Sequence, residues 1–221
     1  MARYLLYEQL EARCLMAATQ VGGEILVNEQ AYGRQLLEAG TEAIGVFDDG
    51  GFVAAFSGRG PTDRAGVYVR RFQDDGTPLG SATLVNSTTA GDQSSPTVAT
   101  FRDGSFVVAW AGRGRGDRHG VFAQWFNLAG DKIGSETRVN TTVGGWQLDP
   151  QVASTPSGQT MIAWHGTGDG DLAGVFSRSF ASDRSPLGSE RRVNSTTADQ
   201  QANPSIAGTL SLVVLVPPGN R

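Results

Sequence analysis

Phe106-Val107-Val108-Ala109-Trp110 is the stretch of sequence that decides the fold, because the chain repeats its pattern at a fixed distance on both sides. The pattern occurs before it as Phe52-Val53-Ala54-Ala55-Phe56 and after it as Thr160-Met161-Ile162-Ala163-Trp164. The three starts at positions 52, 106 and 160 are equally spaced with no gap in the alignment, so the period is 54. A fixed period of this size is typical of solenoids, propellers and arrays, whose units bury their apolar faces against their neighbours. The sequence therefore predicts three tandem copies of one structural unit.

The same period connects glycine, asparagine and proline positions along the chain. The equivalent sets include Gly66, Gly120 and Gly174; Gly80, Gly134 and Gly188; Asn86, Asn140 and Asn194; and Pro96, Pro150 and Pro204. We expect a repeat domain over residues 22–217, with complete units at about 41–94, 95–148 and 149–202, and a tail at 218–221. The first copy carries an insertion of four residues, expected around Ala31 to Ala39.

The sequence of each unit predicts four strands that are separated by turn residues. In the middle copy they are expected at 95–101, 106–110, 120–126 and 136–140. The second strand is apolar on both faces, as in a strand covered on both sides, and the fourth alternates polar with apolar residues, as an edge strand with one wet face does. Four short strands in about 50 residues is the size of a propeller blade. The expected fold class is all-β, a small or incomplete β-propeller.

The ends of the array depart from the repeat. Residues 24–28 have the pattern of a fourth strand, and residues 203–207 and 212–216 have the pattern of two further strands. Two arrangements stay open. These segments could close a fourth, deficient blade together, or they could be open ends through which the chain self-associates, since exposed strand edges invite pairing.

Composition limits the partners of the chain. The net charge of -4 has the wrong sign for neutralising phosphates, so we expect no nucleic-acid partner. One cysteine, Cys14, and two histidines cannot form an internal disulfide or a Cys/His zinc site. The longest apolar run, residues 212–216, is far shorter than the roughly 20 residues that span a bilayer. No transmembrane segment is expected.

The motifs of the unit resemble a tandem repeat of large bacterial surface and hemolysin-type proteins. Copies of that repeat read Asp-Gly-x-Phe-Val-Val-x-Trp, then Gly-Val-Tyr-x-Gln-Arg-Phe, then a segment from a glycine to Val-Asn. Here these are Asp103 to Trp110, Gly120 to Phe126 and Gly134 to Asn140, and the match covers residues 22 to about 207. The resemblance implies a surface or secreted protein, and the repeat itself carries no agreed chemistry.

Residues 1–21 form a separate segment with a second resemblance. Leu10-Glu11-Ala12-Arg13-Cys14-Leu15-Met16-Ala17 resembles the Leu-Glu-Pro-Arg-x-Leu-Leu segment near the start of predicted exported proteins of planctomycete-type bacteria, with Ala12 in place of proline and Met16 in place of leucine. The alternative is an amphipathic helix over the same residues. Together the two resemblances imply an extracellular or cell-surface location in a bacterium.

Aspartates recur in the Gly- and Asp-rich loop that follows the second strand of each unit. Asp63, Asp117 and Asp171 are equivalent, and Asp169 forms the best pair with Asp171. Ca²⁺ takes roughly six to eight oxygen ligands, so one hypothesis is that these four aspartates bind Ca²⁺, although the EF-hand pattern is absent. The alternative is that each aspartate accepts hydrogen bonds from turn amides. No other cofactor is indicated.

Three Asn-x-Ser/Thr motifs begin at Asn86, Asn140 and Asn194, at the end of the fourth strand of each unit. The motif is an acceptor pattern for N-glycosylation. The same residues also suit an Asx turn or a Ser/Thr turn. In a bacterial chain, which both resemblances imply, the turn interpretation is favoured.

No catalytic constellation is evident. The Asp-box of propeller sialidases places a Trp five residues after its Asp, whereas here Asp103 and Trp110 are seven apart. Catalysis needs residues that break the repeat, because polar residues repeated in every copy usually belong to the scaffold. The candidates form no recognisable catalytic arrangement in the sequence: Glu42, His119, Trp146 and His165.

The function expected from the sequence is a non-enzymatic, exported or cell-surface module for binding, adhesion or surface display, with a glycan or a protein as ligand. The alternative is a carbohydrate-binding or carbohydrate-hydrolysing remnant of a larger propeller. In that alternative Trp125 and Trp146, which lie outside the repeat consensus, stack on sugar rings. Core packing is the commoner use of aromatic side chains.

Overall fold

The computed structural model describes residues 24–29, 35–36, 43–208 and 213–216. The segment 1–21, Glu42 and the tail at 218–221 lie outside these ranges. Every regular element in the described ranges is a β-strand, and no helix there is long and apolar enough to cross a membrane. The strands are β1 (Gln35–Leu36), β2 (Ile44–Val46), β3 (Phe52–Gly58), β4 (Gly66–Phe72), β5 (Thr83–Leu84), β6 (Gln93–Thr100), β7 (Phe106–Gly114), β8 (Asp117–Phe126), β9 (Lys132–Arg138), β10 (Gln147–Ser154), β11 (Thr160–Gly168), β12 (Asp171–Phe180), β13 (Arg191–Arg192), β14 (Ser205–Gly208) and β15 (Val213–Val216).

The strands form three antiparallel sheets in chain order, followed by a hairpin. The middle sheet has the order β6-β7-β8-β9 and the third sheet β10-β11-β12-β13. In the first sheet, β3, β4 and β5 follow the same order, while β1 and β2 both pair with β3 and together take the place of the first strand. The hairpin is β14-β15. The prediction of tandem four-stranded units is confirmed.

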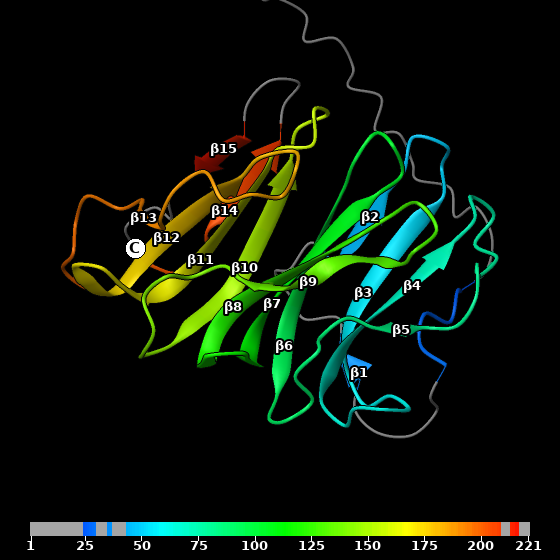
Figure 1. Ribbon diagram of the computed structural model, residues 1–221, viewed down its shortest axis with the longest axis horizontal. Helices are drawn as coiled ribbons and strands as arrows, with labels where there is room; N and C mark the ends of the chain where they lie inside the picture. The colour runs from blue at the N-terminus through cyan, green and yellow to red at the C-terminus, as the bar shows by residue number, and fades with distance from the viewer. Residues whose placement is uncertain (1–23, 30–34, 37–42, 209–212, 217–221) are drawn as a thin grey trace, which may run out of the picture.

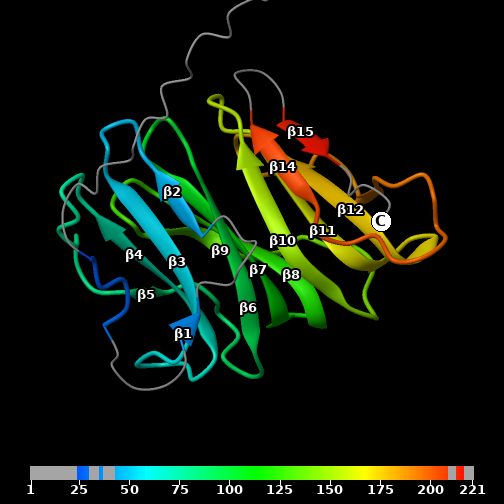
Figure 2. The same ribbon diagram turned by 180° about the vertical axis from the view of Figure 1, so that it is seen from behind.

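The sheets stand side by side as the blades of a propeller do (Figures 1 and 2). The first strand of each sheet contacts the first strand of the next, from β2 to β6, β10 and β14. One core cluster fills the space between the first and middle sheets, and a second fills the space between the middle and third sheets. The middle sheet is therefore covered on both faces by its neighbours, as the apolar second strand predicted.

The repeated aromatic positions occupy equivalent buried sites. Phe56, Trp110 and Trp164 are 5%, 0% and 0% exposed. Each stacks on an aromatic residue of the third strand of its sheet, with ring centroids 5.8, 6.2 and 6.3 Å apart: Tyr68, Phe122 and Phe176. Trp110 and Trp164 therefore have equivalent environments, each in the core against the preceding sheet, whereas Phe56 keeps the ring contact but belongs to neither of these two core clusters.

The connection between the second and third strands is tighter than the sequence predicted. In the middle sheet Gly114 pairs with Asp117, so a turn of Arg115 and Gly116 replaces the expected loop. Gly116 adopts a φ of 80°, which glycine reaches without strain. In the first sheet Pro61 stands in the place of Arg115 and has no N–H to donate, and there the loop persists from Gly58 to Gly66.

Strand register narrows the place of the insertion in the first copy. Gln35 pairs with Gly58, as Gln93 pairs with Gly112 in the middle sheet. The first strand of the first sheet then resumes at Ala43, whose carbonyl accepts a hydrogen bond from Ala55. The extra residues therefore fall within 37–42, which overlaps the end of the range expected from counting.

The two ends of the array lie far apart (Figures 1 and 2). Arg70 donates hydrogen bonds to the carbonyls of Leu26 and Val27 at 3.2 and 3.5 Å, as Arg178 does to a fourth-strand carbonyl of the preceding sheet. Residues 24–28 thus take the position of a fourth strand before the first sheet, without being assigned as a strand. Hairpin β14-β15 packs on the third sheet through Ile206. The described strands form an open array and not a shared closing blade.

Candidate functional site

The repeated aspartates accept hydrogen bonds within their own sheets. In the middle sheet Asp117 is 8% exposed. Its Oδ2 accepts a hydrogen bond from Asn140 Nδ2 at 2.7 Å, and its Oδ1 accepts one from the His119 amide at 3.1 Å. Asp63 and Asp171 have the same two kinds of partner. This geometry favours the interpretation of these residues as acceptors of turn amides.

The carboxylate oxygens of Asp63, Asp117 and Asp171 are thus engaged by asparagine and backbone groups in each copy. Asp63, Asp117 and Asp171 belong to three different sheets, and Asp169 is exposed beside Asp171. Within the described ranges, no group of three or more His, Cys, Asp or Glu side chains is placed to hold a metal ion.

The asparagines of the Asn-x-Ser/Thr motifs complete this network. Asn140 is 1% exposed; its Oδ1 accepts a hydrogen bond from the Val121 amide at 2.8 Å, and its Nδ2 also donates to the Thr142 carbonyl at 2.9 Å. Asn86 is equally buried and makes the same bonds. The amide nitrogen that a glycan would require is occupied and buried at both residues, which favours the turn interpretation.

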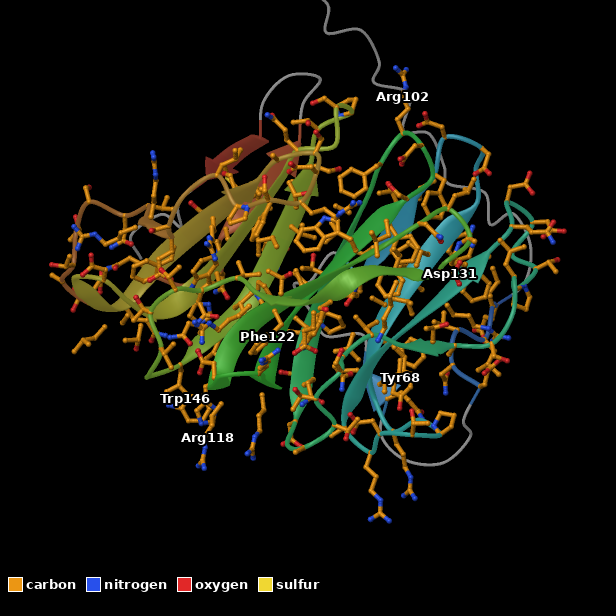
Figure 3. All side chains as sticks on the ribbon, viewed as in Figure 1. Tyr68, Arg102, Arg118, Phe122, Asp131 and Trp146 are labelled. Atoms are coloured by element: carbon orange, nitrogen blue, oxygen red, sulfur yellow. The ribbon has the colours of Figure 1, made fainter. Side chains whose placement is uncertain are left out.

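Two residues that break the repeat meet at the junction of the middle and third sheets. His119 of β8 stacks on Trp146, which immediately precedes β10, with ring centroids 3.9 Å apart and an angle of 29° between the rings. Trp146 is 57% exposed. Figure 3 shows Trp146 and Arg118 projecting at the same edge of the molecule. We call this pair of stacked rings, in which Trp146 is exposed and His119 is half-buried, the His119–Trp146 platform.

The backbone around Trp146 explains its position. Gly144 and Gly145 adopt φ values of 117° and 70°, so the chain turns sharply just before Trp146. The carbonyl of Trp146 then accepts a hydrogen bond from Thr167 at 2.8 Å. A Cβ at Gly166 would lie 1.9 Å from that carbonyl oxygen, so glycine is required for the close approach. The backbone of Trp146 is fixed while its ring stays at the surface.

A pocket of about 440 Å³ lies beside the platform. His119 lines it together with Arg113, Arg118, Val143 and a run of glycines. Both arginines and Val143 are exposed. The site therefore combines an aromatic surface with guanidinium groups, which bind carboxylate and sulfate oxygens through paired hydrogen bonds.

Trp125 does not belong to this surface. It is 4% exposed and makes an edge-to-face contact with Phe180 at 5.3 Å, within the core between the middle and third sheets. The hypothesis that Trp125 stacks on sugar is wrong, because both faces of its strand are covered by neighbouring sheets. Trp146 alone of the two tryptophans is available to a ligand.

A second cluster lies on the first strands, where each has a β-bulge. Ser95 and Asp149 hold equivalent positions with φ values of 51° and 47°. Ser95 Oγ donates a hydrogen bond to Asp149 Oδ1 at 2.9 Å, and His165 Nδ1 lies 3.8 Å from Asp149 Oδ2. Left-handed backbone at residues other than glycine often marks functional sites. Ser95 and Asp149 were not among the residues predicted from the sequence. The available signal was that Asp and Asn tolerate left-handed backbone and that Ser, Asp and Asn side chains form hydrogen bonds within turns.

Acidification is expected to destabilise the protein through His165, which is 6% exposed. Burial lowers the pKa of His165 from its ordinary value of 6.5, and the nearby Asp149 opposes this shift. The unfolded chain therefore binds more protons at this residue than the folded chain once the pH falls below about 6.5. The stability that neutral His165 contributes is present above that pH and is lost as the pH falls through the folded-state pKa.

The measurement is the melting temperature of wild type and His165→Ala between about pH 5 and 7.5. We expect the variant to lose less stability than wild type over the acid half of this range. Alanine fits the position, because Ala111 holds it in the middle sheet. Parallel pH profiles for the two proteins would contradict the assignment.

No protein-family model and no curated protein matches the sequence. Among solved structures, the chain is similar to a polysaccharide lyase of the PL25 type, an ulvan lyase bound to -[GlcA(1-4)Rha3S]-, with a TM-score of 0.55 and 13% identity over 86% of this chain. It spans 50% of the length of that lyase. It is also similar to an endo-arabinase from Bacteroides thetaiotaomicron (TM-score 0.47, 12% identity, 79% of this chain and 73% of that chain). A xylan beta-1,4-xylosidase from Bacillus halodurans matches at a TM-score of 0.45 and 14% identity, over 75% of this chain and 34% of that chain. At these identities the likeness concerns the fold.

Proposed function

We propose that the protein is a carbohydrate-binding module, with the His119–Trp146 platform as the surface on which a sugar ring stacks. The observation that carries the proposal is the platform itself: two residues that break the repeat come from adjacent sheets, and His119 stacks against one face of the exposed Trp146 ring. An exposed tryptophan face is apolar and flat and matches the apolar face of a pyranose ring. Of the two alternatives that the sequence left, this arrangement favours the carbohydrate-related one.

Binding without catalysis is the form of the proposal that fits the groups beside the platform. The neighbouring carboxylate, Asp117, is held under the loop by Asn140 and the His119 amide and so is not a free acid or base. The ulvan lyase that shares the fold is bound to a polysaccharide fragment, which agrees with a glycan ligand here. An exported or cell-surface location, implied by the resemblance to bacterial surface repeats, is part of the proposal.

Adhesion through Arg115-Gly116-Asp117 is a less suitable function for the same face. This tripeptide is the one that integrin ligands display, but display requires a carboxylate that the partner can reach. Asp117 is 8% exposed and its carboxylate accepts two hydrogen bonds from the protein. The buried carboxylate therefore favours a structural role for Asp117.

Trp146→Ala is expected to weaken glycan binding about tenfold, because the variant loses the ring on which the sugar stacks. The test is affinity electrophoresis of the full chain in gels that contain one polysaccharide each, from a panel of neutral and acidic polymers. Trp146 is 57% exposed, so the variant should keep the melting temperature of wild type.

Leu172→Ala is the matched control. Leu172 is 83% exposed and holds, in the third sheet, the position that Arg118 holds beside the platform. We expect it to bind like wild type. Failure of every polysaccharide to retard wild type, or equal binding by wild type and Trp146→Ala, would contradict the proposal. Release of reducing ends or unsaturated products from the bound polymer would instead favour the enzymatic alternative.

A further inference from the structure

We infer that the ligand of the His119–Trp146 platform is an anionic glycan, whose carboxylate or sulfate groups are bound by Arg113 and Arg118. The inference rests on the proposed carbohydrate-binding function and specifies the class of glycan. Carboxylate and sulfate present the same chemistry to a guanidinium, namely negatively charged oxygens that accept paired hydrogen bonds.

The two arginines share one pocket with the platform. Arg113 lies near the end of β7 and Arg118 near the start of β8, and His119 lines the pocket and also forms half of the platform. Gly91, with a φ of 83°, lies so close to Arg113 that an added Cβ would stand 3.0 Å from the Arg113 Cδ. The stem of Arg113 therefore packs on the backbone and is partly preorganised. A sugar on the platform would have these guanidinium groups beside it.

Arg113 and Arg118 form no ion pair with a carboxylate of the described residues. Within the described ranges, the ion pairs of arginine are Arg70–Glu29 and Arg102–Asp48. Arg113 and Arg118 take no part in them and are exposed. Asp117 also lines the pocket, but its carboxylate accepts hydrogen bonds from Asn140 and from the His119 amide. In a chain of net charge -4, such a local excess of positive charge attracts anions.

The repeat itself shows that this combination is specific to the middle copy. At the positions of Arg113, Arg115 and Arg118, the third sheet has Thr167, Asp169 and Leu172, and the first sheet has Arg59, Pro61 and Arg64. The first sheet thus keeps two arginines, but Ala65 and Asp92 replace His119 and Trp146. Arginines and an aromatic platform occur together in the middle copy alone. We therefore assign them to one site.

Single-stranded nucleic acid also combines stacking with negative charge, but it fits this surface less well. Proteins that bind it present a series of aromatic side chains along a basic groove. Here there is one aromatic platform and, among the described residues beside it, no series of aromatic side chains. An acidic polysaccharide has its charged groups on the pyranose ring itself, so one ring can place its apolar face on the platform and its charge beside the arginines.

The experiment is affinity electrophoresis of the full chain in gels that contain alginate, dextran sulfate or neutral dextran. We expect alginate, dextran sulfate or both to retard wild type, with the first reporting carboxylate and the second sulfate recognition, and neutral dextran not to retard it. The double variant Arg113→Ala/Arg118→Ala should bind the retarding polymer about tenfold or more weakly, and added salt should weaken the binding of wild type.

The double variant Arg59→Ala/Arg64→Ala is the matched control, because it removes the same charge from the equivalent positions of the first sheet. We expect its affinity to stay within about twofold of wild type, since the distant charges are screened. An equal loss in both double variants would overturn the inference in favour of net charge alone. Tighter binding of single-stranded DNA than of either anionic polysaccharide would also overturn it, as would no retardation by either. A different result is retardation by neutral dextran that depends on Trp146 and not on Arg113 and Arg118. That result would overturn the assignment of an anionic glycan and leave the proposed carbohydrate-binding function standing.

Discussion

Trp110→Ala is expected to lower the free energy of unfolding by about 3–5 kcal/mol, as large-to-small changes of buried aromatic residues do. Trp110 is 0% exposed, and its ring stacks on Phe122 in the core between the first and middle sheets. Because each sheet buries its apolar faces against its neighbours, the cavity would loosen two sheets at once. A domain is stable by only about 5–15 kcal/mol, so the variant should unfold near room temperature or in low concentrations of denaturant.

Trp110→Phe is the control for this effect. Phe56 holds the equivalent position in the first sheet, so the unit accepts phenylalanine there. The indole nitrogen of Trp110 is buried without a hydrogen-bond partner, so the exchange breaks no hydrogen bond. We expect Trp110→Phe to lose less than half as much stability as Trp110→Ala, measured by urea unfolding with circular dichroism. Equal losses would show that a phenyl ring restores none of the packing of the indole, which would contradict the expected tolerance for phenylalanine at this position.

The repeat was enough to predict the architecture, because the physical signal that specifies it is local. A strand such as 106–110, apolar on both faces, must be covered on both faces, and copies one period apart can cover one another. The turn signals between strands then set the order within each sheet. The all-β class, the four strands of each unit and the equivalence of Trp110 and Trp164 were predicted correctly on these grounds.

Details that depend on strand register could not be predicted from the sequence. Counting residues located an insertion between residues 28 and 42 but could not say which residues keep the pairing of the strand. The fourth strands also differ in a way that their alignment conceals. β9 pairs over Lys132–Arg138, whereas β5 and β13 have two residues each. Pairing depends on backbone geometry at Gly134 and its equivalents, which residue type alone does not determine.

The candidate site could be predicted from the sequence only in part. His119 and Trp146 could be identified as residues that break the repeat, but their contact arises from the packing of one sheet on the next. Trp125 broke the same rule and is buried in the core. The difference lies in position: Trp125 belongs to a strand covered on both faces, whereas Trp146 follows a glycine turn just before the first strand of the next sheet. Departure from a repeat therefore indicates function best where it falls on an exposed turn.

The hydrogen-bond network of the repeated aspartates and asparagines is a second source of stability, distinct from the aromatic core. Asn140 connects three parts of its sheet: the Asp117 carboxylate, the Val121 amide and the Thr142 carbonyl. A buried polar group that loses its partner bears the full cost of its desolvation, and a charged group bears more than a neutral one. The network should therefore be intolerant of the loss of its central member.

Asn140→Ala is expected to lower the free energy of unfolding by about 3 kcal/mol or more, since it leaves the carboxylate of Asp117 and the amide of Val121 buried without this partner. Asn194→Ala is the matched comparison, because Asn194 makes the same bonds in the third sheet but is only partly buried. Water can reach the groups that it abandons, so we expect roughly half the loss there. Urea unfolding of both variants measures the difference. If Asn194→Ala were as costly as Asn140→Ala, burial would not be the source of the penalty. If neither variant were destabilised, the network would position the loops that carry His119 and Trp146 without stabilising the fold, and only ligand affinity would change.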